Sequence, residues 1–220
     1  KEQKKGLAHK LLTGKIRLAN FKGKWQNKSL ADYFEKIYDK NNENNTNILT
    51  MSAQSGLIRQ EHFFSKQVAS ENLSRYFLLK KGDYAYNKSY SAGYPLGAIK
   101  RLDNFEKGIL SPLYICFRIK EQRISNDYCK HYFDSGLLNK EIQKIAQEGA
   151  RNHGLLNVSS EEFFQMCIHV PAEIKEQEAI AKILTTANLE IELLEKELEM
   201  IKEQKKALME LLLTGIVRVK

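Results

Sequence analysis

The sequence predicts an α+β fold, in which a globular domain of short strands and helices is followed by a long coiled-coil helix. Three observations predict it: residues 19–170 alternate short β-favouring runs with polar loops, residues 187–213 carry an unbroken heptad pattern, and residues 1–18 are repeated near the C-terminus. Of the 220 residues, 42% are hydrophobic and 28% are charged, which excludes wholesale disorder.

An internal repeat relates the two ends of the chain. Residues 1–18, KEQKKGLAHKLLTGKIRL, match residues 202–219, KEQKKALMELLLTGIVRV, at 11 of 18 positions. The two copies lie 201 residues apart, too far for a solenoid, so we expect each copy to end one large module. Since the chain starts inside a helical pattern, we interpret residues 1–18 as the tail of a preceding spacer helix and the chain as a piece of a longer protein.

The globular domain is expected to span residues 19–170. Gly82 and Asp83 are expected to form the turn that starts a strand, with Tyr84 and Tyr86 of that strand in the core. Two helices are expected to follow, near residues 127–135 and 138–146. The β-favouring runs are residues 48–51, 76–79, 84–87 and 113–119.

Polar loops of this domain carry the side chains that contact DNA in other proteins. Arg, Lys, Asn and Gln match base edges or phosphates, whereas Ser mostly positions the backbone. The loop Lys88–Ser91 is the best candidate for reading bases, and Lys100 and Arg101 are expected to meet phosphates. For each residue a turn or surface role is an equal alternative. The candidates are Ser52, Gln54, Arg59, Lys88, Ser89, Tyr90, Ser91, Lys100, Arg101, Arg151, Asn152 and His153.

Residues 171–220 are expected to form a short helix, a brief break at Thr185 and Thr186, and then a long helix over residues 187–213, which we call the rod. Apolar residues recur in the rod at alternating spacings of 4 and 3, which predicts a two-helix coiled coil. The alternative is a long amphipathic helix packed on its own domain. The seam positions, one of which is a lysine, are Ala187, Ile191, Leu194, Leu198, Ile201, Lys205, Leu208 and Leu212.

The charge of the chain favours a polyanion partner. The net charge is +8, and residues 1–30 alone hold nine basic residues against one acidic residue. No apolar run approaches the roughly 18 residues that span a bilayer, so we expect a cytoplasmic protein with no membrane partner.

Motifs of nucleotide, dinucleotide, metalloprotease and hydrolase sites are absent from the sequence. The three cysteines lack zinc-site spacing. We therefore expect a non-catalytic chain that holds neither a cofactor nor a metal.

Seven segments, taken in order, resemble those of the DNA specificity subunits of type I restriction-modification enzymes. The resemblance covers essentially the whole chain, and the ordered set is specific although no single segment is. The segments are GLI at 56–58, KKGDYAYNKSYS at 80–91, GAIKR at 97–101, GILSPLY at 108–114, GAR at 149–151, VPAEIKEQEAIAKIL at 170–184 and LLTG at 212–215.

The resemblance implies the organisation of such subunits, in which two target recognition domains stand in tandem. Each domain is followed by a spacer helix, and the two helices are antiparallel. Residues 1–18 would then be the tail of the central spacer, residues 19–170 the second target recognition domain, and residues 171–220 the distal spacer.

The resemblance also implies a function and partners. The chain would read one half of a bipartite double-stranded DNA site, and its spacer would set the half-site distance and dock methylation subunits. S-adenosylmethionine is expected on the methylation subunits, and motor-nuclease subunits and a homodimer of this half-subunit are further expected partners. The alternatives are a coiled-coil protein scaffold and the recognition end of a single-chain methyltransferase-restriction enzyme.

Overall fold

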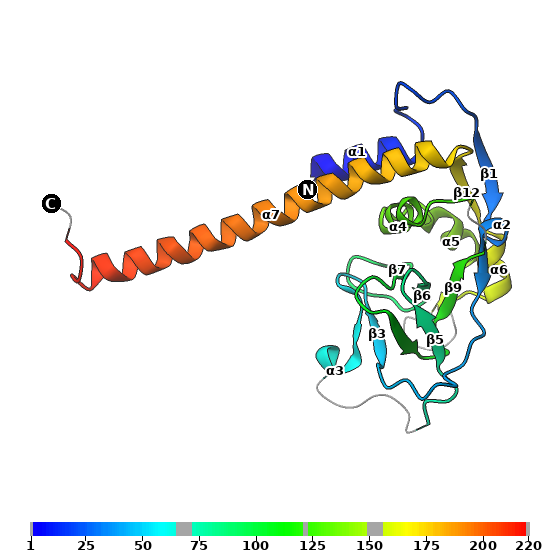
Figure 1. The fold of residues 1–220 in the computed structure, drawn as a ribbon, viewed down its shortest axis with the longest axis horizontal. Helices are drawn as coiled ribbons and strands as arrows, with labels where there is room; N and C mark the ends of the chain where they lie inside the picture. Colours follow the sequence, from blue (N-terminus) through cyan, green and yellow to red (C-terminus); the bar gives the residue numbers. More distant parts are fainter. Residues whose placement is uncertain (1, 65–71, 121–122, 149–155, 219–220) are drawn as a thin grey trace.

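A globular domain carries a long projecting helix in the computed structural model, which describes residues 2–64, 72–120, 123–148 and 156–218 (Figure 1). The projecting helix, α7, spans Ile174–Leu213, and a short N-terminal helix, α1, spans Glu2–Leu12 and lies beside its first half. The two helices run in opposite directions (Figure 1). The α+β fold class with a long C-terminal helix is therefore confirmed.

A four-stranded antiparallel sheet in the order β2-β9-β6-β7 forms the centre of the domain. The predicted strands lie close to β3, β5, β6 and β9. Tyr84 and Tyr86 of β6 are fully buried, as predicted. The strands of this sheet are β2 (Phe34–Lys36), β6 (Tyr84–Asn87), β7 (Ala98–Arg101) and β9 (Ile115–Ile119).

Paired strands surround the central sheet. The pair β1–β12 joins the first and last strands of the domain, so helices α1 and α7 both leave the domain from the same end (Figure 1). The pairs are β1 (Trp25–Ser29) with β12 (Cys167–Pro171), β3 (Leu49–Ser52) with β4 (Gly56–Arg59), β5 (Phe77–Lys80) with β8 (Lys107–Leu110), and β10 (Gln147–Glu148) with β11 (Leu156–Asn157).

Helices pack against these strands. The two helices predicted after residue 126 are present as α4 and α5, and Ser125 caps α4 by accepting a hydrogen bond from the backbone N–H of Tyr128. None of the helices in the described ranges is both long and apolar enough to cross a membrane. The remaining helices are α2 (Leu30–Tyr33), α3 (Gln60–Phe63), α4 (Asn126–Asp134), α5 (Asn139–Ile145) and α6 (Ser160–Gln165).

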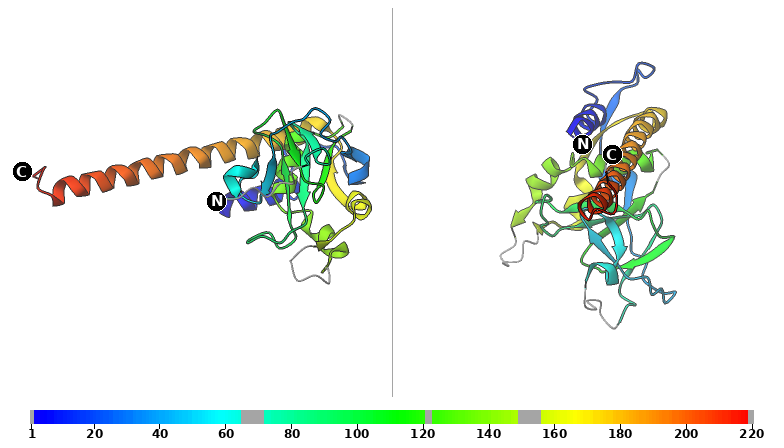
Figure 2. Two further views of the ribbon diagram at one scale, coloured as in Figure 1. Left: turned by 90° about the horizontal axis from the view of Figure 1, so that it is seen from below. Right: turned by 90° about the vertical axis from the view of Figure 1, so that its left-hand side faces the viewer.

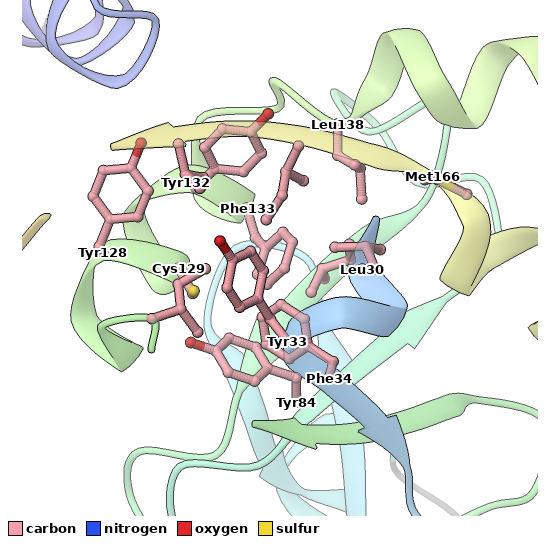
Figure 3. Close-up of a cluster of buried hydrophobic side chains, with 14 of the residues drawn as sticks. Leu30, Tyr33, Phe34, Tyr84, Tyr128, Cys129, Tyr132, Phe133, Leu138 and Met166 are labelled. Carbon is pink, nitrogen blue, oxygen red and sulfur yellow. The ribbon is translucent and has the colours of Figure 1, made fainter. Parts of the chain in front are cut away.

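An aromatic core joins the sheet to α4 (Figure 3). The ring of Tyr84 stacks on that of Phe117 with centroids 5.4 Å apart, and Phe133 of α4 meets Tyr84 edge-on at 5.3 Å. The Tyr84 hydroxyl donates a 2.6 Å hydrogen bond to Asn126 Oδ1, so the buried polar end of the ring is satisfied. This core fixes α4, and α4 in turn supports α7.

The break predicted at Thr185 and Thr186 is wrong, because α7 runs through both residues without interruption. Residues 174–213 contain neither proline nor glycine, the two residues that most strongly end a helix. The Thr185 hydroxyl instead hydrogen-bonds His131 Nε2 of α4 at 2.8 Å. The threonines therefore lie inside one helix of 40 residues, roughly 60 Å long at 1.5 Å per residue.

The two copies of the repeat end in the same backbone turn. The Thr13 hydroxyl donates to the His9 carbonyl at 2.6 Å, and the Thr214 hydroxyl donates to the Glu210 carbonyl at 2.6 Å. The glycine that follows has a φ of 70° at Gly14 and 71° at Gly215, the left-handed conformation typical of a helix C-terminus. The sequence repeat is thus also a structural repeat.

Candidate nucleic-acid interface

The turn between β3 and β4 presents two of the predicted contact residues. Ser52 Oγ accepts a 3.0 Å hydrogen bond from the Ser55 N–H, which closes the turn, and Gly56 follows with a φ of 81°. Gln54 is exposed in this turn. Ser52 therefore shapes the turn. Gln54 is exposed to solvent, and its amide group can both donate and accept hydrogen bonds, as contact with a base edge requires.

Arg59 lies at the end of β4 and keeps half of its side chain exposed. Its Nη1 is 3.3 Å from Glu61 Oε1, and its guanidinium lies 5.8 Å from the centroid of the Phe105 ring. An exposed ion pair of this kind contributes little to stability. Arg59 can therefore leave Glu61 for a phosphate with little loss of free energy.

The loop between β6 and β7 holds the second group of predicted residues. Asn87 Oδ1 accepts a 3.0 Å hydrogen bond from the Ser89 N–H, and the backbones of Ser91 and Tyr94 pair through two hydrogen bonds. These contacts order the loop and leave the Tyr90 ring 63% exposed. An ordered, exposed aromatic ring is well suited to contact a ligand with little loss of side-chain entropy.

Lys88 is held more tightly than the sequence indicated. Its Nζ donates to the Val158 carbonyl at 3.4 Å, and its own carbonyl accepts a 3.1 Å hydrogen bond from the Leu156 N–H. Lys88 therefore ties this loop to β11, and the contacts favour a positioning role for it.

The two loops pack against one buried cluster. Ala53 of the β3–β4 turn and Tyr94 of the β6–β7 loop both pack against the same buried cluster, which includes Leu57 and Ala98. We call residues 52–56 and 88–96 the recognition loops, since they hold the predicted contact residues. Arg151, Asn152 and His153 lie outside the described residues, although β11, which follows them, is bonded to Lys88.

Lys100 and Arg101 have structural contacts. Lys100 Nζ is 2.6 Å from Asp134 Oδ1, and Arg101 bonds Asp103 at 2.6 Å and Asp127 at 2.8 Å. Each basic side chain is only 14% exposed. Because carboxylates already neutralise both charges, the contacts support a role in joining β7 to α4 and give no support to the predicted phosphate contacts.

Replacing Gly97 by alanine is expected to destabilise the β6–β7 loop. Gly97 has a φ of 75°, and a Cβ there would lie 2.1 Å from the Asn87 carbonyl oxygen. We expect a loss of more than about 2 kcal/mol in the free energy of unfolding, measured by urea denaturation. The matched control is Gly93→Ala, at φ 81° but in open space, with an expected loss of about 1 kcal/mol. Equal losses for the two variants would contradict this account.

A second site, which sequence reasoning missed, lies where helices α1 and α7 leave the domain. Arg17 forms two hydrogen bonds with Glu176, of 2.7 Å from Nε and 2.8 Å from Nη2, and Trp25 Nε1 is 3.3 Å from Glu176 Oε1. The Glu176 side chain is 1% exposed. We name this site the helix-base socket and define it by Trp25, Glu176, Ile180, Ala181 and Leu184.

The first copy of the repeat fills the helix-base socket. Leu11 and Leu12 are 2% and 1% exposed and belong to the same buried cluster as Ile180 and Leu184. Next to Gly14, the Trp25 ring lies 3.3 Å from the position that a Cβ would take, so the ring covers this glycine closely. The signal that could have identified this site is the arginine shared by the two copies of the repeat, Arg17 and Arg218.

Beyond Ile191, every described residue of α7 is exposed, and the helix stands clear of the domain (Figure 2). Ala187 and Ile191 are partly buried, whereas Lys205 and the other seam positions are exposed, with Leu194 at 56% and Leu198 at 51%. Exposed leucines at heptad spacing indicate a surface that associates with another helix. The coiled-coil interface stays a prediction.

The globular domain on a helical spacer has the fold of one half of the specificity subunits of type I restriction-modification systems. The chain superimposes on the HsdS subunit from Thermoanaerobacter tengcongensis with a TM-score of 0.54 and 12% identity, covering 89% of this chain and 46% of that one. For the type I S subunit from M. genitalium the TM-score is 0.50 with 13% identity, covering 94% and 52%.

A curated protein gives the corresponding sequence match. The chain is 33% identical over 150 residues to the type I restriction enzyme MjaVIII specificity subunit of Methanocaldococcus jannaschii. The match covers 65% of this chain and 33% of that subunit, so the chain spans about a third of the curated relative. No protein-family model matches the chain. The resemblance seen in the sequence is thereby confirmed, and the alternative of a coiled-coil scaffold is not favoured.

Proposed function

We propose that this chain reads one half of a bipartite double-stranded DNA sequence as part of a specificity subunit, without catalysing a reaction itself. The observation that carries the proposal is that the chain matches about half of two solved specificity subunits in fold, and that 150 of its residues match a curated specificity subunit in sequence. The recognition loops supply exposed polar and aromatic side chains, Gln54 and Tyr90. The net charge of +8 favours a polyanion.

The spacer would set where a second reader lies on the same duplex. Helix α7 is roughly 60 Å long, which is somewhat less than two turns of B-DNA at about 34 Å each. Two readers held at a matching separation gain affinity through effective concentration. In this proposal methylation subunits dock on the spacer and carry S-adenosylmethionine, motor-nuclease subunits cut the DNA, and the complex works in the cytoplasm.

Binding of the full chain to a randomised 30-base-pair duplex, followed by fluorescence anisotropy, tests the proposal. We expect the affinity to fall roughly tenfold to several-hundredfold between 50 and 200 mM salt, because a few phosphate contacts release counterions. We also expect the selected sequences to share a short motif, and the double substitution Gln54→Ala with Tyr90→Ala to abolish that preference.

Tyr38→Ala is the matched control for the tyrosine. Tyr38 is 71% exposed and follows β2, at the opposite edge of the four-stranded sheet from β7. Its loss is expected to leave the selected motif unchanged. Binding that is insensitive to salt would contradict DNA recognition, and a motif unaffected by the double substitution would remove the recognition loops as the reading surface.

A further inference from the structure

A short turn between β8 and β9, residues 111–114, carries an exposed leucine on an ordered backbone. Leu113 is 75% exposed, more than any other large hydrophobic residue in the described part of the globular domain. The Ser111 carbonyl accepts a 3.2 Å hydrogen bond from the Tyr114 N–H, and Ser111 Oγ accepts a 3.4 Å hydrogen bond from the Leu113 N–H. Pro112 fixes its own backbone φ. The turn therefore holds the backbone of Leu113 in one conformation at the surface.

The turn itself gives no reason for a leucine at this position. Turns of this kind favour Gly, Pro, Asn, Asp and Ser, and an apolar side chain left in water adds no stability. Tyr114 is the residue that anchors the turn, because its hydroxyl lies 3.4 Å from Thr50 Oγ1 of β3 and its side chain packs against the buried cluster that holds Leu57 and Ala98. Leu113 stays exposed and is available to contact a ligand.

Strand pairing places this turn beside the first recognition loop. Strand β8 lies beside β3, and the bridge between Ile48 and Ile109 is parallel, so the two strands point in the same direction. Each of these strands is followed directly by its turn, so the two turns lie at the same end of the pair. The exposed Gln54 belongs to one turn and Leu113 to the other.

The same turn also lies beside the second recognition loop. Strands β6 and β9 are antiparallel, and Tyr86, next to last in β6, pairs with Ile115, the first residue of β9. The end of β6 therefore meets the start of β9, and the loop 88–96 leaves the sheet where residues 111–114 enter it. Leu113 is thereby placed between a loop that presents Gln54 and a loop that presents Tyr90.

We propose that Leu113 contacts the C5-methyl group of a thymine in the major groove, so that the chain selects a T·A pair at one position of its site. Among the base edges of the major groove only thymine presents an apolar group, and a leucine side chain neither donates nor accepts a hydrogen bond. Gln54 in the neighbouring turn carries an amide that matches adenine. The inference rests on the proposed function, because it names a specificity-determining residue for the same recognition of DNA.

Deoxyuridine substitution tests the contact, because deoxyuridine differs from thymidine only in lacking this methyl group. Each thymine of the selected motif is replaced in turn, and binding of the unchanged chain and of Leu113→Ala is followed by fluorescence anisotropy. At one position we expect the replacement to weaken binding of the unchanged chain about fourfold, which corresponds to the burial of one methyl group. Leu113→Ala is expected to bind the thymine duplex several-fold more weakly and to show no deoxyuridine effect at that position.

Leu193→Ala is the matched control, since Leu193 is a leucine of 56% exposure on α7 that lies outside the predicted seam. It is expected to keep the deoxyuridine effect, and both variants are expected to keep the urea midpoint of the unchanged chain because both side chains are exposed. A selected motif with no thymine whose effect Leu113→Ala removes would overturn this inference alone. Equal weakening by Leu113→Ala on every duplex, as insertion between base pairs predicts, would also overturn it alone. Binding without any sequence preference would contradict the proposed function as well.

Discussion

Replacing Arg17 by alanine is expected to lower the free energy of unfolding of the monomeric chain by about 3 kcal/mol. Glu176 is 1% exposed and accepts two hydrogen bonds from Arg17, so the variant leaves a buried carboxylate without its cation. The value lies at the lower end of the range for broken buried ion pairs, because Arg17 is 33% exposed. Urea denaturation at protein concentrations that keep the chain monomeric measures the loss.

The double variant Arg17→Ala with Glu176→Gln is the control. Glutamine keeps an acceptor for Trp25 Nε1 and removes the buried charge, so we expect it to recover most of the lost stability. Trp25, the sole tryptophan, reports on the socket through its fluorescence, which should change in Arg17→Ala before the domain unfolds. A loss below about 1 kcal/mol, or a double variant no more stable than the single one, would contradict this role of the ion pair.

Local patterns in the sequence were sufficient to predict four of the strands, β3, β5, β6 and β9, and two of the core residues. The turn at Gly82 and Asp83 starts β6, and the alternation that places Tyr84 and Tyr86 inside is a local property of a strand. The heptad pattern likewise predicted the long helix, because the spacing of apolar residues along a helix depends only on the residues of that helix.

Side-chain pairing across the fold could not be predicted in the same way. Glu176 and Arg17 are 159 residues apart, and Arg101 reaches Asp127 on a helix 26 residues later. From the sequence alone, a basic residue at the end of a strand is interpreted as a phosphate ligand. Only the fold shows that a carboxylate lies beside it and pairs with its charge. Thr185 was misread for the same reason, since its partner His131 lies on α4.

The candidate recognition loops were predicted by residue type, and the fold adds which side chains are free to act. Ser52 and Lys88 are occupied by contacts that shape their loops. Gln54 and Tyr90 are exposed on loops that these contacts order. Residue type alone predicted which side chains could contact DNA. The packing of the loops separates Ser52 and Lys88, which hold the loops in shape, from Gln54 and Tyr90, which are exposed.

Lowering the pH is expected to weaken the attachment of α4 to α7 through His131. The pKa of His131 is lowered to about 4, chiefly by burial and also by the charge of the neighbouring Lys130, while the charge of Asp134 opposes the shift. The unfolded chain has a histidine pKa near 6.5, so it binds the proton more readily than the folded chain. The contribution of His131 is therefore complete above about pH 6.5 and is lost as the pH falls toward 4, by up to about 3 kcal/mol.

The difference between the chain and its His131→Gln variant isolates this effect from the carboxylates that titrate in the same range. We expect the stability of the unchanged chain to fall more steeply between pH 6.5 and 4 than that of the variant, as measured by urea denaturation at each pH. Thr185→Val removes the 2.8 Å hydrogen bond and keeps the histidine buried, so it should lower stability by about 1 kcal/mol at every pH and keep the slope. If the His131→Gln variant shows the same slope as the unchanged chain, the buried histidine does not govern the acid sensitivity of this junction.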